Sequence, residues 1–169
     1  MELMVFRHGI AEDVSQDGTD EARALTPKGV KRTCAAVRGL ASLADPPEAI
    51  LTSPLVRARQ TAEIAAEAWD VEPEVMQELG AQVVPDIVAA LSGRTEERVM
   101  IVGHEPSLGR TIAALCAGAG ATTRDVVALG KAGCAGVSVT FAPPHPANGT
   151  LVWLATPRML RALGARAAR

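Results

Sequence analysis

The chain has 169 residues, of which 48% are hydrophobic and 21% charged, the composition of a globular protein rather than a disordered one. Lys plus Arg number 17 and Asp plus Glu number 19, so the formal net charge is −2, and only 2% of the residues are aromatic. These values exclude a global positive field or a base-stacking platform for nucleic acid, and any anion site must be local.

Strands and helices alternate over most of the sequence. The predicted elements are, in chain order, a strand at 2–6, a loop at 10–25, a helix at 27–44, a strand at 48–52, a helix at 54–68, a short edge strand within 71–79, a helix at 85–93, a strand at 98–102, a helix at 107–117, strands at 126–129, 136–141 and 150–155, and a helix at 157–165. This order predicts one α/β domain, residues 1–169, with a mostly parallel sheet.

Three predicted strands end in loops that carry unusual residues: Arg7-His8-Gly9, the segment Ser53–Arg57, and Gly103-His104-Glu105. Because ligands bind beyond the carboxyl ends of strands in open α/β sheets, we expect two histidines and two arginines to converge there. Arginine's planar fork suits phosphate oxygens. Nearby positive charge keeps an imidazole neutral, and a neutral imidazole can attack phosphorus. The sequence therefore predicts phosphoryl transfer through an enzyme phosphohistidine.

Four segments in this order and spacing resemble the histidine phosphatase superfamily, and most closely its small phosphohistidine phosphatases of the SixA type. They are Phe6-Arg7-His8-Gly9, the segments Leu25–Gly29 and Ser53–Ala62, and Val102-Gly103-His104-Glu105-Pro106. The resemblance implies a three-layer α/β/α sandwich like that of phosphoglycerate mutase, and a reaction that needs no metal or other cofactor.

The resemblance also implies a role for each matching residue. His8 would be the nucleophile, Arg7 and Arg57 would grip the phosphoryl oxygens, His104 would complete the phosphate pocket, and Gly9 would allow close approach of the backbone. A glutamate after the third strand is the general acid in many relatives, and Glu78 has a comparable place in the sequence. Mutase relatives carry an Asn after the Arg-His-Gly triplet, which is absent here and argues against a mutase.

The expected activity is hydrolysis of phosphohistidine in a protein, such as a histidine-phosphotransfer domain or a phosphotransferase component. Imidazole leaves a phosphohistidine more easily than an alkoxide leaves a phosphoester, because imidazolium has a pKa of about 6.5. This lessens the need for a general acid. Two alternatives remain open at this point: a phosphatase of small phosphoesters or phosphoanhydrides, and a phosphate-binding module without catalysis.

The rest of the sequence gives weaker indications. No apolar run approaches the roughly 18 residues of a membrane span, the three separated cysteines indicate neither disulfides nor zinc, and a cytoplasmic location is expected. Glu105 could orient a neighbouring arginine. The basic residues near the C-terminus are most simply a solvated helix face: Arg158, Arg161, Arg166 and Arg169.

Overall fold

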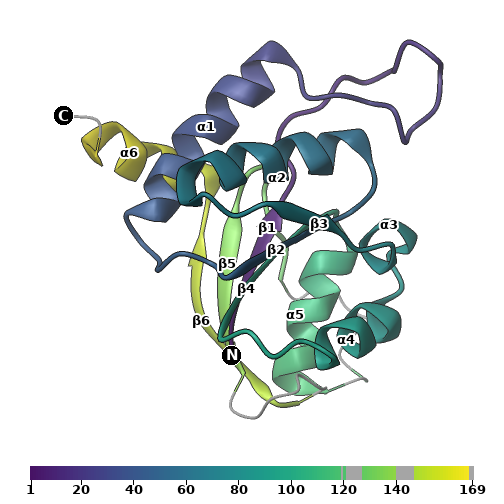
Figure 1. The fold of residues 1–169 in the computed structure, drawn as a ribbon, viewed down its shortest axis with the longest axis vertical. Coiled ribbons are helices and arrows are strands. Elements are labelled where there is room, and N and C mark those ends of the chain that lie inside the picture. The colour runs from purple at the N-terminus through teal and green to yellow at the C-terminus, as the bar shows by residue number, and fades with distance from the viewer. Residues whose placement is uncertain (119, 121–126, 140–146, 168–169) are drawn as a thin grey trace.

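The computed structural model describes residues 1–118, 120, 127–139 and 147–167 (Figure 1). In chain order the elements are β1 (Glu2–Arg7), α1 (Pro27–Ala41), β2 (Ala49–Thr52), α2 (Val56–Trp69), β3 (Pro73–Val75), α3 (Glu78–Ala81), α4 (Val84–Ser92), β4 (Arg98–Gly103), α5 (Ser107–Ala117), β5 (Cys134–Val139), β6 (Gly149–Ala155) and α6 (Pro157–Ala167). Among these residues, no helix is both long and apolar enough to cross a membrane.

The six strands form one sheet in the order β3-β2-β4-β1-β5-β6. The first four are parallel to one another, whereas β5 pairs antiparallel with both β1 and β6. Helices α1, α2 and α6 cover one face of the sheet, and α3, α4 and α5 cover the other (Figure 1). The predicted three-layer α/β/α sandwich with a mostly parallel sheet is therefore confirmed.

The buried strand β1 shows how the two cores form. Leu3 and Val5 join the cluster under α3, α4 and α5, whereas Met4 and Phe6 join the cluster under α1, α2 and α6. Side chains alternate between the faces of a strand, so a strand that is covered on both sides reads as a continuous apolar run.

The structure differs from the expected elements at three places in the chain. Helix α2 begins at Val56 rather than at Ser53-Pro54, and the unexpected short helix α3 follows β3. The strand predicted at 126–129 is wrong for 127–129, and residue 126 lies outside the described part, as do the last two residues of the strand predicted at 136–141. Residue 129 is held by side chains instead of a strand neighbour, because its N–H and carbonyl bond to Glu105 and Arg7.

Helix α6 lies directly on α1 because glycines face each other at the crossing. A Cβ on Gly39 would come within 1.9 Å of the Leu160 carbonyl oxygen, and a Cβ on Gly164 would come within 2.2 Å of the Ala35 carbonyl oxygen. The two backbones can therefore touch only without side chains at these positions. This contact places α6 beside the loop that follows β1.

We expect Gly39→Ala to lower the free energy of unfolding by about 1–3 kcal/mol, because the new methyl group would overlap backbone that cannot move aside. Urea unfolding measures this change. Gly93→Ala is the control, since its Cβ would meet only the Ala90 carbonyl oxygen at 3.7 Å. An equal or higher stability of Gly39→Ala would contradict the close helix contact.

Candidate active site

The loop that follows β1 carries Arg7, His8 and Gly9, and bonds from other segments fix its backbone. The His8 N–H donates to the Gly103 carbonyl oxygen (3.1 Å), and the Gly9 N–H donates to Thr61 Oγ1 (3.0 Å). A Cβ on Gly9 would lie 2.3 Å from Thr33 Oγ1, so only glycine lets the loop pack against α1. The loop is thus held at the carboxyl end of β1 by β4, α1 and α2.

His8 is buried and holds one tautomer. Its Nδ1–H donates to the Gly9 carbonyl oxygen at 2.7 Å, because a carbonyl can only accept. Burial, together with the smaller effects of the charges of Arg57, Arg7 and Lys131, lowers the pKa of His8 from 6.5 to about 4 against the opposing effect of the Gly9 bond. At neutral pH the imidazole is therefore uncharged, with its lone pair on Nε2.

His104, after β4, lies beside His8, with the two ring centroids 5.0 Å apart. Its Nε2 is 2.8 Å from Ser53 Oγ at the end of β2. Burial is the largest cause that lowers the pKa of His104 to about 3, followed by the repulsion that His8 would exert if both rings were protonated and then by the charge of Arg57. Two strand-end loops thus bring two neutral imidazoles together, as the sequence predicted.

Arg57, in the first turn of α2, joins this group and carries a carboxylate partner. Its Nη1 donates to the Asp20 carbonyl oxygen (2.6 Å) and its Nη2 to Asp20 Oδ2 (2.7 Å), and this bond lowers the pKa of Asp20. Asp20 comes from the long loop between β1 and α1, which projects beyond the sheet (Figure 1). The neighbouring Glu21 carbonyl oxygen accepts from the Val56 N–H and so caps α2.

Arg7 is positioned through a backbone segment rather than by a carboxylate. Its Nη1 donates to the Leu129 carbonyl oxygen at 2.6 Å. The Leu129 N–H in turn donates to Glu105 Oε1 (2.6 Å), and Glu105 Oε2 accepts from the Gly109 N–H in α5 (3.2 Å). Glu105 therefore orients a neighbouring arginine indirectly, by fixing the peptide that Arg7 binds.

Three buried side-chain atoms lack a hydrogen-bond partner within the described part of the chain: Arg7 Nε, His104 Nδ1 and Thr33 Oγ1. All three belong to this site or to the residue that packs on Gly9. Buried polar atoms are rarely left unpaired, so their clustering marks a place where a ligand would complete the hydrogen bonding. Because Arg7 and Arg57 both lie near His8 and His104, the arrangement suits a tetrahedral oxyanion.

Glu78, the predicted general acid, lies near the same edge of the sheet but contacts neither histidine through a hydrogen bond. It is the first residue of α3, which packs against Pro54 at the end of β2, so it lies near the carboxyl edge of the sheet. Its side chain is half-buried and makes no hydrogen bond or ion pair to His8 or Arg57. Its role therefore stays a prediction.

The sequence reasoning did not single out Asp20, Ser53 or Thr61 as site residues. Ser53 and Thr61 both lie in the segment Ser53–Ala62, so the family resemblance of that segment is a sequence signal that points to their hydroxyl groups. Asp20 is one of several acidic residues in a polar loop, and no pattern in the sequence separates it from the others. Only the fold shows which carboxylate reaches Arg57.

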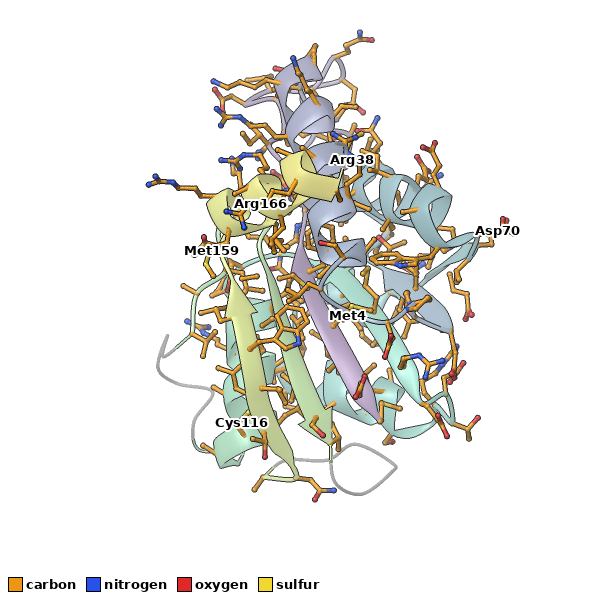
Figure 2. All side chains as sticks on the ribbon, turned by 90° about the vertical axis from the view of Figure 1, so that its left-hand side faces the viewer. Met4, Arg38, Asp70, Cys116, Met159 and Arg166 are labelled. Atoms are coloured by element: carbon orange, nitrogen blue, oxygen red, sulfur yellow. The ribbon has the colours of Figure 1, made fainter. Side chains whose placement is uncertain are left out.

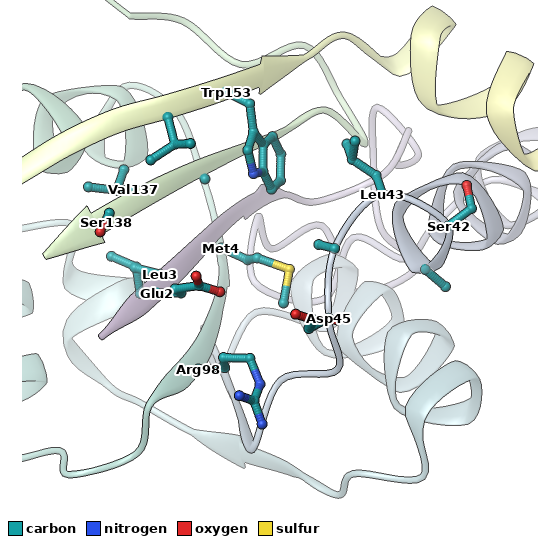
Figure 3. Close-up of a pocket in the computed structure, with 14 residues that line it drawn as sticks. Glu2, Leu3, Met4, Ser42, Leu43, Asp45, Arg98, Val137, Ser138 and Trp153 are labelled. Atoms are coloured by element: carbon teal, nitrogen blue, oxygen red, sulfur yellow. The ribbon is translucent and has the colours of Figure 1, made fainter.

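A hollow of about 390 Å³ lies elsewhere, at the amino ends of β1 and β4 (Figure 3). Trp153 and Met4 form its apolar part, and Glu2, Asp45 and Arg98 lie around it. None of the predicted site residues lines it. The chemistry at the carboxyl edge of the sheet therefore takes place away from this hollow.

Comparisons with known proteins agree with this geometry. The family model described as "Histidine phosphatase superfamily (branch 1)" matches residues 3–81. An uncharacterized protein of Picosynechococcus sp. is 41% identical over 142 residues, 81% of this chain and 84% of that protein. The phosphohistidine phosphatase SixA homolog of Haemophilus influenzae is 30% identical over 128 residues, 68% of this chain and 77% of that protein. A solved structure of the protein histidine phosphatase SixA complexed with tungstate has a TM-score of 0.80 at 26% identity, and the match covers 94% of this chain and 98% of that one.

The lowered pKa values predict a loss of stability in mild acid. Between pH 6.5 and about 4 the unfolded histidines bind protons that folded His8 and His104 do not, so the free energy of unfolding falls as the pH falls. We expect a loss of about 1–2 kcal/mol for each histidine between pH 7 and pH 5, measured by urea unfolding. The variant with both histidines changed to glutamine should lose much less stability over this pH range. An equal loss would contradict the lowered pKa values of His8 and His104.

The pair between Asp20 and Arg57 predicts a gain of oxyanion affinity when the carboxylate is removed. Asp20→Asn should bind tungstate about two- to fivefold more tightly in calorimetry, because a charge that competes for Arg57 and repels the anion is lost. The gain is modest because the Asp20 side chain is 55% exposed. Arg57→Gln should change affinity the other way, weakening binding by about 1.5–3 kcal/mol. Unchanged affinity in both variants would separate this pair from the anion site.

Proposed function

The chain is a phosphatase of the histidine phosphatase superfamily, and we propose that it removes the phosphoryl group from phosphohistidine side chains of other proteins. The observation that carries the proposal is the neutral His8 whose Nε2 lone pair lies among two guanidinium groups and a second neutral imidazole. The reaction proceeds in two steps through a phosphohistidine formed on His8, and the protein uses no metal in either step.

In the first step the His8 Nε2 lone pair forms a bond to phosphorus while the bond from phosphorus to the substrate imidazole breaks. The Gly9 carbonyl oxygen holds the proton on Nδ1 and so directs Nε2 toward the phosphoryl group. Arg7 and Arg57 balance the charge on the equatorial oxygens as it shifts in the transition state. Arg57 exchanges its bond with Asp20 for one with the phosphoryl group.

His104 donates a further hydrogen bond. If the Ser53 hydroxyl donates to Nε2, the proton of the neutral ring resides on Nδ1, the buried atom that has no partner in the described part of the chain. That N–H then points to a phosphoryl oxygen. Ser53 acts here as a positioning residue that fixes the tautomer of His104.

In the second step water attacks phosphorus and the bond to His8 Nε2 breaks. Because Nδ1 keeps its proton throughout, His8 leaves as a neutral imidazole and needs no acid. The same argument applies to the substrate. A phosphohistidine protonated on its other nitrogen departs as neutral imidazole, whereas an alkoxide requires a proton donor such as Glu78.

The similarity to two proteins that are named phosphohistidine phosphatases supports this choice of substrate. The expected partner is a phosphorylated protein, such as a histidine-phosphotransfer domain or a phosphotransferase component. The same site could act on small phosphoesters, and the choice of substrates in the experiment separates the two activities.

The experiment compares a phosphorylated histidine-phosphotransfer domain with a panel of sugar phosphates and a generic aryl phosphate, each with and without a chelator. We expect the highest kcat/KM for the phosphoprotein, no effect of the chelator, and an acid-labile, base-stable phosphoryl adduct. His8→Asn should abolish turnover and the adduct, because it removes the attacking lone pair.

Ser53→Ala is the matched control for the role of His104, since it removes only a hydroxyl group. It should lower kcat by about tenfold or more through the loss of one oriented donor while the adduct still forms on His8. A higher kcat/KM for the sugar phosphates would overturn the proposed substrate. An adduct on serine would overturn the nucleophile, and phosphate binding without turnover would indicate a binding module.

A further inference from the structure

We propose that a basic pocket beside His8 binds acidic side chains that flank the phosphohistidine of the substrate protein, an inference that rests on the proposed function. The pocket has a volume of about 400 Å³ and is formed by α1, the turn before β5 and the start of α6. It would let the enzyme select phosphohistidines by the charge of their surroundings.

Four cationic side chains line this basic pocket: Arg32 from α1, Lys131 from the turn, and Arg158 and Arg161 from α6. None of them has a hydrogen bond or an ion pair to another residue of the described chain. By contrast, Arg7 and Arg57 in the candidate active site both donate hydrogen bonds to backbone carbonyl oxygens. The pocket therefore holds positive charge that no residue in the described part of the chain neutralises.

The two helices that form the pocket carry basic residues and no acidic ones. Lys28, Lys31, Arg32 and Arg38 lie in α1, and Arg158, Arg161 and Arg166 lie in α6. Figure 2 shows nitrogen-tipped side chains around these helices, including the labelled Arg38 and Arg166. Arg158 and Arg166 are exposed, as expected for the solvated helix face that the sequence indicated, and in a chain whose net charge is −2 this face is also a local positive field.

The basic pocket adjoins the candidate active site. Ile10, two residues after the nucleophile, lines it, and the charge of Lys131 is felt at His8. Thr33 also lines it, and its fully buried Oγ1 has no partner among the described residues. A ligand that fills the phosphate site can therefore extend into this pocket without leaving the protein surface.

The distribution of the cations favours a polypeptide over a small anion. The four side chains come from three segments, and three of them are exposed rather than drawn into one buried cradle. Flexible, solvated charges of this kind steer and select a partner with several separate carboxylates. One tetrahedral anion needs converging, buried donors, which are found instead at Arg7 and His104.

The test uses three phosphohistidine peptides of equal length, in which the residues around the phosphohistidine are all Glu, all Gln or all Lys. We expect kcat/KM to fall in that order for the native protein. The double variant Arg158→Gln/Arg161→Gln should lose about five- to thirtyfold in kcat/KM on the Glu peptide, chiefly through KM, and should change little on the Gln peptide.

The matched control is Arg38→Gln/Arg166→Gln, which removes the same amount of charge, one residue from α1 and one from α6, outside the pocket. It should keep the preference for the Glu peptide to within about twofold, since exposed charges that do not contact the bound peptide contribute little. An equal loss in both double variants would assign the preference to a diffuse field and overturn the pocket. The absence of any preference among the peptides would overturn it as well.

A second measurement separates this inference from the proposed function. The unphosphorylated Glu peptide should inhibit hydrolysis of an aryl phosphate by the native protein and inhibit Arg158→Gln/Arg161→Gln at least about fivefold more weakly. If that inhibition is observed while the phosphohistidine peptides are not hydrolysed, the pocket stands and only the proposed substrate fails. Equal inhibition of both proteins, or stronger inhibition by a single-stranded oligonucleotide than by the peptide, would overturn the acidic-peptide pocket.

Discussion

Desolvation of two imidazoles beside two guanidinium groups is the constraint on which the site depends. Burial removes the water that would stabilise a third and a fourth positive charge beside Arg7 and Arg57, so His8 and His104 stay neutral. A protonated His8 would have no lone pair for phosphorus and would repel its neighbours. Neutrality thus allows His8, the proposed nucleophile, to lie among the cations that an anionic substrate requires.

Burying these four side chains together costs free energy on folding, and the surrounding polar groups hold them in place. Thr61 binds the Gly9 N–H, Ser53 binds His104, and Glu105 fixes the Leu129 peptide that orients Arg7. Each support comes from a different element than the residue that it supports. The site is therefore a property of the assembled sheet edge, where β1, β2 and β4 end together.

The formal net charge of −2 conceals an uneven distribution of charge over the protein. Asp20 partly neutralises Arg57, whereas the cations of the basic pocket between α1 and α6 keep no partner within the described chain. The charge of the proposed phosphate site is thus partly balanced by a carboxylate on a projecting loop, and the neighbouring surface remains positive. The glycine contact between α1 and α6 brings the C-terminal arginines to this surface.

The sequence by itself determined the fold class, because strands buried on both faces read as apolar runs and proline after a capping residue marks the start of α1. It also placed Arg7, His8 and His104 at strand ends and Arg57 in the segment that follows a third strand, since their motifs are short and local. It could not give the partners of these groups. The pairing of Asp20 with Arg57, the loss of the expected strand at 127–129, and the gathering of Arg158 and Arg161 beside Lys131 all join residues distant in the chain. Only tertiary packing decides them, because the energy of a charge or hydrogen bond depends on burial and distance rather than on position in the sequence.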